Sequence, residues 1–213
     1  MIYRKFGKRF LDILISLIAL PFVALAVLVA GIAIVIDDGF PIFYNANRIG
    51  KDRKEFKMFK LRSMRNNAPD LRMADGSTYN APDDPRLTKV GRLLRKSSVD
   101  ELPQVINVLI GQMSFIGPRP DLPDEALLYE EHEWHRLDVR PGITGYSQAY
   151  YRNAIQTKEK YKNDIYYVDH MSFLLDLKIL FQTIKSVLGS EGIYAQDTDV
   201  DVSNLEDRVG AEK

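Results

Sequence analysis

Two adjacent carboxylates, Asp100 and Glu101, follow the basic residues Arg95 and Lys96, at a point where a helix is expected to begin. The first turn of a helix has unpaired N–H groups, which keep an aspartate ionised and attract phosphate oxygens. An ionised aspartate next to a phosphate serves as a nucleophile or as a ligand for a metal ion. The spacing therefore points to phosphate chemistry centred on Asp100.

The same stretch has a purely structural interpretation. Ser98 and Glu101 have the spacing of a capping box, in which two side chains satisfy the free amides at the start of a helix. Acidic residues in a first helical turn also suit the helix dipole. The local sequence leaves both the structural and the catalytic interpretation open.

Basic and amide side chains elsewhere are candidates for binding phosphate. Lys60 and Arg62 end an alternating segment that is either a solvated basic surface or a surface facing phosphate. Arg119 stands between two prolines, which suits a fixed bidentate contact but also occurs in plain rigid turns. Gln148 and Arg152 follow a constrained turn and are further candidates. The chain has neither a Gly-Lys-Ser/Thr phosphate loop nor a dinucleotide-binding glycine motif, so side chains must bind the phosphate.

Composition limits the class of protein. The chain has 213 residues, 46% of them apolar, which is enough for one core of ordinary domain size with an accessory element. Its formal charge is +0, but residues 1–65 hold twelve Lys and Arg against five acidic residues, which suits anionic lipid or phosphate. Without cysteine it forms neither disulfides nor thiolate zinc sites, and its three histidines are too scattered for a metal site.

Residues 11–36 form an apolar segment long enough to cross a bilayer, which takes about 20 residues. A cleaved signal peptide is disfavoured, because the apolar run continues well past the small residues near its middle. Basic residues flank both ends, so the positive-inside rule favours both ends in the cytoplasm. Pro21 is expected to break the helix. The residue pattern leaves open a spanning helix and a bent hairpin that enters and leaves by the same face.

The remaining pattern predicts an α+β fold, mostly helical with a few short strands. We expect strands at 41–44, 56–61 and 146–151, a loop at 66–85, and helices at 88–96, 99–109, 122–137, 158–168 and 171–188. The last helix is amphipathic, and its apolar stripe packs either in the core or at a membrane interface. The expected division is a basic N-terminus with a membrane helix (1–38), a catalytic domain (39–188) and an acidic tail (189–213).

Seven motifs in order resemble the monotopic phosphoglycosyl transferases, bacterial enzymes that place a sugar phosphate on a polyprenol phosphate. The motifs are residues 8–12 (KRFLD), 59–64 (FKLRSM), 84–88 (DPRLT), 100–104 (DELPQ), 113–120 (MSFIGPRP), 139–145 (VRPGITG) and 175–178 (LDLK). The resemblance covers about residues 8–188. So many matches in order are highly specific.

The resemblance implies a reaction and its residues. Asp100 would attack the sugar-bearing phosphate of a UDP-sugar, release UMP and form a phosphosugar ester, which undecaprenyl phosphate then attacks. Mg²⁺ near Asp100 would offset diphosphate charge, and Glu101 would assist as base or by supporting the metal ligand. The family also places phosphate or nucleotide contacts at Arg62, Arg95, Arg119, Arg140 and Arg152, to which the residue pattern adds Lys60 and Gln148.

The resemblance further implies a re-entrant helix hairpin with interfacial amphipathic helices, and a catalytic domain on the cytoplasmic face of the bacterial inner membrane. The expected partners are membrane lipids and downstream glycosyltransferases of glycoconjugate or polysaccharide biosynthesis, and no nucleic acid. The family's helix break is a Ser-Pro farther along the segment, whereas this chain has only Leu20-Pro21, so the hairpin's depth and angle do not carry over.

Donor identity follows from a shorter match. Residues 152–155 (RNAI) resemble members that use N-acetylated amino sugars such as diacetylbacillosamine. The alternatives are a hexose donor with the same chemistry, or a non-catalytic, membrane-anchored assembly protein in which residues 98–101 are only a cap.

Overall fold

The computed structural model describes residues 2–69, 71, 79, 84–151 and 155–189, and these are mostly helical with a few short strands, as predicted. The helices are α1 (Lys8–Asp38), α2 (Lys89–Ser97), α3 (Gln104–Leu109), α4 (Pro123–Ala126), α5 (Tyr146–Tyr150), α6 (Thr157–His170) and α7 (Phe173–Gly189). Further π-helical or 3-10 turns occupy Tyr3–Gly7, Lys51–Arg53, Val99–Glu101 and Glu131–Asp138. The strands are β1 (Ala46–Ile49), β2 (Glu55–Met58), β3 (Ser114–Ile116) and β4 (Gly142–Thr144).

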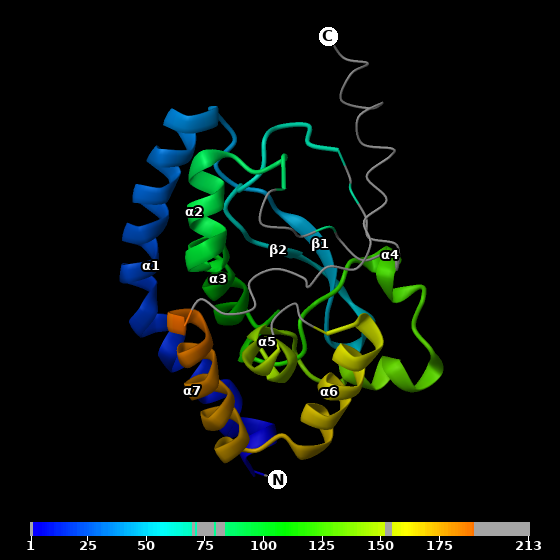
Figure 1. Cartoon of the computed structure of the whole chain (residues 1–213). Coiled ribbons are helices and arrows are strands. Elements are labelled where there is room, and N and C mark those ends of the chain that lie inside the picture. The colour runs from blue at the N-terminus through cyan, green and yellow to red at the C-terminus, as the bar shows by residue number, and fades with distance from the viewer. Residues whose placement is uncertain (1, 70, 72–78, 80–83, 152–154, 190–213) are drawn as a thin grey trace.

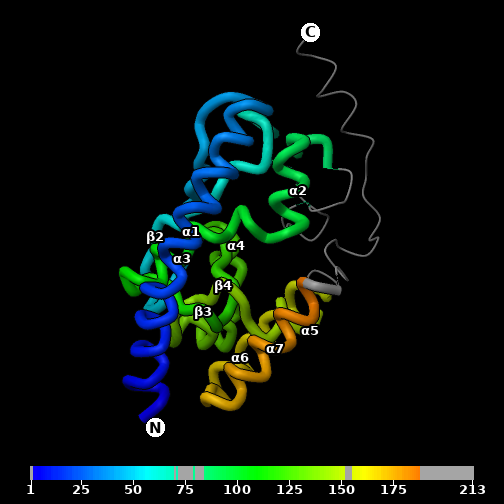
Figure 2. Tube along the Cα trace, turned by 90° about the vertical axis from the view of Figure 1, so that its left-hand side faces the viewer, coloured from blue at the N-terminus to red at the C-terminus, as the bar shows by residue number. Residues whose placement is uncertain are grey.

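Helix α1 lies along one side of the domain, with α2 and α3 beside it and α4 and α6 on the opposite side (Figure 1). The prediction that Pro21 breaks this helix is wrong, because helical backbone runs from Lys8 to Asp38 without interruption. A hairpin of two separate arms is therefore not confirmed. The helix instead bends along its length, as Figure 1 and Figure 2 show. Proline removes one hydrogen bond, and a long helix accommodates this as a bend when its other turns are intact.

One face of α1 packs on the domain and the other is apolar and open. Residues at helical spacing, among them Val23, Ala30 and Ile34, are buried. The open face carries Phe10, Leu14, Leu17, Ile18, Phe22, Leu25, Leu28, Val29, Ile32 and Ile36. Among the described residues, the helical stretch Tyr3–Asp38 is the one that is long and apolar enough to cross a membrane.

Both ends of α1 are fixed to the same domain. Near its start, Arg9 Nη1 donates to the Val108 carbonyl at the end of α3 over 2.6 Å. At its last turn, Asp37 Oδ2 accepts from the Val90 amide at the start of α2 over 2.8 Å. The helix thus lies along the domain and does not project from it.

Helix α7 also shows an apolar face to the outside. The interpretation that its apolar stripe packs in the core is wrong, because Leu177, Phe181 and Ile184 are 37%, 64% and 48% exposed. Ile179 and Asp176, on the other side of the helix, are buried instead. An exposed apolar stripe of this kind is typical of a surface that contacts a membrane or another protein.

The strands form two small sheets. β1 and β2 are antiparallel, with Ala46 opposite Met58, so the predicted strand 56–61 is confirmed in part as β2. The predicted strand 41–44 is wrong, since this segment forms an isolated antiparallel bridge, Phe43 opposite Leu61, and no strand. The parallel pair β3 and β4, with Ser114 opposite Gly142, was not predicted, because three-residue strands leave no measurable periodicity.

Two further predicted elements are wrong. The helix expected at 122–137 is divided, because Glu130 has an extended backbone and its amide donates to Glu133 Oε2 over 2.8 Å, which starts a new helical turn. The strand expected at 146–151 is helix α5. Tyr146 and Tyr150, four residues apart, place their ring centroids 4.8 Å from each other, a contact that helical spacing permits.

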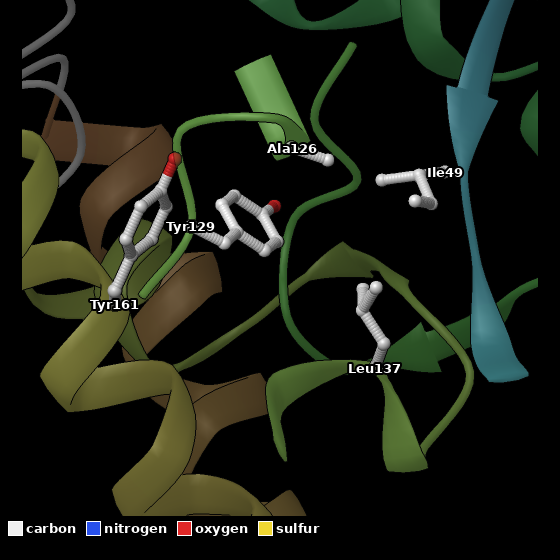
Figure 3. Packing of buried hydrophobic residues seen from close by; sticks show 5 residues of the cluster. All are labelled: Ile49, Ala126, Tyr129, Leu137 and Tyr161. Carbon is white, nitrogen blue, oxygen red and sulfur yellow. The ribbon is translucent and has the colours of Figure 1, made fainter. Parts of the chain in front are cut away.

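The core nearest the sheet of β1 and β2 joins four parts of the chain. Ile49 from β1 packs with Ala126 from α4, and Figure 3 shows Tyr129 and Leu137 beside them and Tyr161 from α6 next to Tyr129. The Tyr129 and Tyr161 ring centroids are 5.0 Å apart, in an edge-to-face arrangement. This packing supports the loop that follows β3.

Candidate active site

The two central carboxylates lie in the 3-10 turn Val99–Glu101, between α2 and α3. The capping-box interpretation is wrong, because Ser98 makes no side-chain cap bond, has a left-handed backbone (φ 58°) and ends α2 through its amide. The helix predicted at 99–109 begins only at Gln104, since Pro103 has no N–H with which to continue an earlier helix. The glutamate side chain is therefore available to other partners.

Two cations hold Asp100 and Glu101. Lys60 Nζ lies 2.9 Å from Asp100 Oδ2 and 3.4 Å from Glu101 Oε1, and Arg119 Nη2 donates to Glu101 Oε1 over 2.7 Å. Burial opposes ionisation of Glu101, but Arg119 and Lys60 outweigh it and lower the pKa of this carboxyl to about 2. Glu101 in turn raises the pKa of Arg119. The Glu101–Arg119 pair is thus ionised at neutral pH.

Asp100 is 2% exposed and keeps an oxygen with unused lone pairs. Lys60 reaches ion-pair distance of Oδ2, but this oxygen accepts no hydrogen bond of normal geometry from the described residues. Arg95 is a further cation in its surroundings. Burial lowers the pKa of the Arg95 guanidinium, and Asp100 opposes that shift. A buried carboxylate among cations, with free lone pairs, has the properties of a nucleophile or a metal ligand.

Backbone pairing brings Lys60 to the carboxylates. The Leu61 amide donates to the Asp100 carbonyl over 2.9 Å, which joins the chain after β2 to the turn Val99–Glu101. Asn107, buried in α3, accepts from the Phe59 amide over 2.9 Å and donates to a β2 carbonyl over 2.8 Å. These contacts fix the strand end that carries Lys60 against the helix that follows the carboxylates.

A buried ion network positions Arg119. Arg136 Nη2 donates to the Arg119 carbonyl over 2.9 Å, and the same guanidinium pairs with Asp121 and Asp164. Lys160 Nζ lies 2.8 Å from Asp121 Oδ1. Sequence reasoning missed this network, because the charged residues are far apart in the chain and belong to no motif that predicts their burial.

The loop after β3 also packs closely on the turn that contains β4. A Cβ on Gly145 would lie 2.1 Å from the Gly117 carbonyl oxygen, and one on Gly142 would lie 2.1 Å from the Gly117 amide nitrogen. Only glycine permits these approaches. Gln148 Oε1 lies against the same turn, and both polar atoms of its amide are buried without a hydrogen-bond partner among the described residues. Its contact with a ligand stays a prediction.

Two of the predicted phosphate contacts lie elsewhere. Arg62 is 4% exposed, and its guanidinium is engaged at the C-terminal end of α1 with Asp38 and nearby backbone carbonyls. Arg140 Nε donates to the Gly111 carbonyl, beyond the far end of α3, over 2.7 Å. Arg152 lies outside the described residues. The predicted cations that the structure brings to the carboxylates are Lys60, Arg95 and Arg119.

Arg48 in β1 is a site residue that the sequence did not single out. Its Nε is buried without a hydrogen-bond partner among the described residues. Burial lowers the pKa of its guanidinium, and the neighbouring Arg119 lowers it further. A guanidinium without a carboxylate partner, beside a second one, suits an anion that binds from outside. The only signal in the sequence is the basic composition of residues 1–65.

The site fits Mg²⁺ only together with a phosphate substrate. The described part of the chain holds no group of three or more acidic, histidine or cysteine side chains that could bind a metal. Mg²⁺ is commonly held by one or two carboxylates and by phosphate oxygens of a substrate. Asp100, whose Oδ2 has free lone pairs, could supply the protein ligand. The remaining ligands would have to come from substrate and water.

The structure thus combines a buried aspartate among cations with a helix, α1, that has an exposed apolar face. The chain belongs to the bacterial sugar transferase family, whose model matches residues 3–190. This confirms the phosphoglycosyl transferase family predicted from the motifs.

Its relatives include an uncharacterized sugar transferase, EpsL, of Bacillus subtilis, 44% identical over 186 residues that cover 87% of this chain and 89% of that protein. A UDP-N-acetylgalactosamine-undecaprenyl-phosphate N-acetylgalactosaminephosphotransferase of Aeromonas hydrophila is 36% identical over 88% of this chain. An undecaprenyl-phosphate galactose phosphotransferase of Salmonella typhimurium is 36% identical over 89% of this chain. The alignments cover only 45% and 42% of those two proteins.

Proposed function

We propose that this protein transfers a sugar 1-phosphate from a UDP-sugar to undecaprenyl phosphate through a covalent intermediate on Asp100. Membership of the family and the names of two relatives support the class of reaction and the acceptor. The observation that carries the proposal is Asp100 Oδ2, which is buried among cations and accepts no hydrogen bond from the described residues.

The chemistry has two steps at one phosphorus atom. An Asp100 oxygen attacks the phosphorus that carries the sugar, the bond from this phosphorus to UMP breaks, and a phosphosugar ester remains on Asp100. An oxygen of undecaprenyl phosphate then attacks the same phosphorus, the ester bond breaks, and the aspartate is restored. The two steps allow one site to serve a water-soluble donor and a lipid acceptor in turn.

Charge neutralisation is the main task of the surrounding side chains. Phosphoryl transfer depends on positioning and on stabilising negative charge, which Lys60, Arg95 and Arg119 supply around Asp100. Glu101 holds Arg119 and Lys60 in place. Mg²⁺, when bound by Asp100 and the donor diphosphate, would offset further charge.

The placement of α1 supports attachment to one leaflet. Its 31 residues extend over about 46 Å, more than the roughly 30 Å of a hydrocarbon core. A helix that crossed the bilayer would carry its ends to opposite sides, yet both ends contact the same polar domain. We therefore propose that the bent α1 enters and leaves at the cytoplasmic face of the inner membrane, with the apolar face of α7 in the interface.

The proposed donor is an N-acetylated amino sugar, and a hexose is the alternative. The two relatives' names mention N-acetylgalactosamine and galactose, so both kinds of sugar occur in the family. A screen of UDP-sugars for UMP release in the presence of undecaprenyl phosphate decides between them. The lipid-linked product would then pass to downstream glycosyltransferases.

The first prediction concerns the nucleophile. Asp100→Asn should abolish both UMP release and a phosphosugar adduct detected by mass spectrometry with donor alone, because an amide is not a nucleophile here. Asp124→Asn, an exposed carboxylate, serves as the control and should behave as wild type. Turnover close to wild type in Asp100→Asn would exclude the covalent mechanism. No activity of the wild type with any donor would favour the non-catalytic alternative.

A further inference from the structure

A basic cavity of about 150 Å³ lies at the N-terminal end of α1. It is lined by Arg4, Lys8, Arg9, Asp12, Lys51, Ser114, Asp138, Val139, Arg140 and Met171. A cavity of about this volume holds a group the size of benzene, so a phosphate group fits. The lining differs from that of an ordinary apolar void, because half of its residues are cations.

The charges of this cavity do not balance. Five cations and two carboxylates line the cavity, and one of the cations, Lys8, is paired with Asp176 outside the lining over 2.6 Å, so an excess of two positive charges remains. Both lining carboxylates also have other partners. Asp12 Oδ1 accepts from the Ser114 hydroxyl (3.0 Å) and the Phe115 amide (3.1 Å), and Asp138 Oδ2 contacts His135 Nδ1 (2.7 Å). The remaining positive charge favours binding of an anion from outside the chain.

Two of the cations, Arg140 and Lys51, have N–H groups that could bind such an anion. Arg140 Nε donates to the Gly111 carbonyl over 2.7 Å, which fixes the guanidinium plane and leaves its terminal amino groups without a partner among the described residues. The exposed Lys51 ammonium has no hydrogen bond or ion pair within the same residues. A fixed guanidinium with free N–H groups matches the geometry of a phosphate, and a lysine supplies a point charge.

The cavity lies where α1 meets lipid and away from the transfer site. Phe6 and Phe10, at the same end of the helix, are 72% and 65% exposed, as expected for side chains that enter the acyl region. Arg9 and Arg140 donate to the carbonyls of Leu109 and Gly111, at the end of α3 that is far from Asp100. About ten residues of helix and turn, or roughly 15 Å, separate Asp100 from the end of α3 where Arg9 and Arg140 lie. A phosphate in this cavity is therefore not the phosphate that Asp100 attacks.

We propose that this cavity binds a phosphate group, and that its source is the headgroup of an anionic membrane phospholipid. The bound lipid would fix the depth of α1 at the leaflet that supplies the acceptor. The inference depends on membrane attachment and not on the transferase chemistry, so a failure of the Asp100 mechanism would leave it standing.

The test measures lipid binding to the full chain in detergent by native mass spectrometry. Short-chain phosphatidylglycerol is the probe, and phosphatidylcholine of equal chain length, which has no net charge, is the comparison. Lys51→Gln/Arg140→Gln should weaken phosphatidylglycerol binding about 10- to 100-fold, the effect of losing charge-assisted contacts. The control Lys54→Gln/Arg92→Gln removes the same charge from exposed positions outside the cavity and should stay within about twofold of wild type.

Three outcomes decide the matter. Equal losses in the cavity and control variants would overturn the site, because diffuse charge would then explain binding. The Lys51 side chain has no partner among the described residues, so Lys51→Gln should not disturb the fold. If the double variant folds poorly, Lys51→Gln alone should still weaken phosphatidylglycerol binding several-fold. Inorganic phosphate in lipid-free detergent could also raise the melting temperature of the wild type but not of the cavity variant. If that happened while phosphatidylglycerol bound no better than phosphatidylcholine, the lipid source would be overturned and the cavity would be assigned to free phosphate.

Discussion

Asp100 and Glu101 are neighbours in sequence but have different surroundings. Asp100 is buried with an oxygen that accepts no hydrogen bond from the described residues, whereas Glu101 is tied to Arg119 and Lys60. The first arrangement leaves a carboxylate available for chemistry, and the second uses one to hold cations in place. The roles of the two residues therefore follow from their contacts.

The second prediction concerns Glu101 and pH. Its pKa is lowered from an ordinary value of 4.5 to about 2, so its pairing stabilises the fold fully above pH 4.5 and less as pH falls toward 2. Glu101→Gln should therefore lower the melting temperature in detergent most above pH 4.5, and the difference from wild type should shrink toward pH 2. Thermal unfolding of both proteins at stepped pH measures this. A difference that does not change with pH would mean that the charge of Glu101 contributes nothing.

The third prediction concerns Arg48, whose guanidinium stands beside Arg119 with a buried, unpartnered Nε. If it binds the donor diphosphate, Arg48→Gln should raise the donor KM about 10- to 100-fold, the effect of a lost charged hydrogen bond, and leave the acceptor KM nearly unchanged. Arg92→Gln, an exposed residue of α2, is the control. A change in the acceptor KM alone would instead assign Arg48 to the lipid phosphate.

At the scale of elements, the end of α1 is joined to the segment that carries Lys60. Arg62 closes this end by binding Asp38 and nearby carbonyls, and the Arg62 amide also donates to the Ile42 carbonyl over 2.8 Å. Helix C-termini carry partial negative charge, which a buried guanidinium satisfies. Helix α1 and the turn Val99–Glu101 are thus connected through two residues of the same motif, Lys60 and Arg62.

The fourth prediction follows from this joint. Arg62→Gln should destabilise the fold by about 2–4 kcal/mol, because Asp38 and the helix-end carbonyls lose their partner. The adduct yield per folded molecule with donor alone should change little. Thermal unfolding and adduct mass spectrometry on the same sample test both parts. A normal melting temperature with lost donor binding would instead restore Arg62 as a phosphate contact.

At the scale of the whole molecule, the open apolar faces of α1 and α7 and the two attached ends of α1 support the proposed orientation toward lipid. The domain contacts α1 near Arg9 and again near Asp37, so the apolar face between them turns away from the domain. A monotopic protein requires this arrangement, in which one side of the molecule is apolar and both flanks stay in water.

The fifth prediction tests that orientation. The chain has no cysteine, so single cysteines at Lys5 and Tyr44, both exposed, can be labelled without background. Both should react with an impermeant thiol reagent from the same side of sealed vesicles. Reagent trapped inside the vesicles supplies the control for sidedness. Labelling from opposite sides would show that α1 crosses the bilayer.

The sequence by itself determined the family, the apolar helix and the helical class, because motif residues and a long apolar run are local signals that survive without coordinates. It also singled out Asp100 and Glu101 as the pair that we propose to be catalytic. The ends of α2 and α6 lie within two residues of the predicted bounds for the same reason. The parallel pair β3 and β4, the 3-10 turn at Asp100 and helix α5 were not predicted, since each depends on contacts with distant segments.

Only the tertiary structure decided which cations serve the carboxylates. Arg62 and Arg140 belong to the family motifs, yet backbone carbonyls elsewhere engage them. Arg48, which no motif contains, lies near Arg119, and the network around Arg136 binds the Arg119 carbonyl. A motif specifies the type of a side chain, but the direction of its charged group depends on the partners that folding places within about 3 Å. Those partners come from segments far apart in the chain, and so no local pattern could have revealed them.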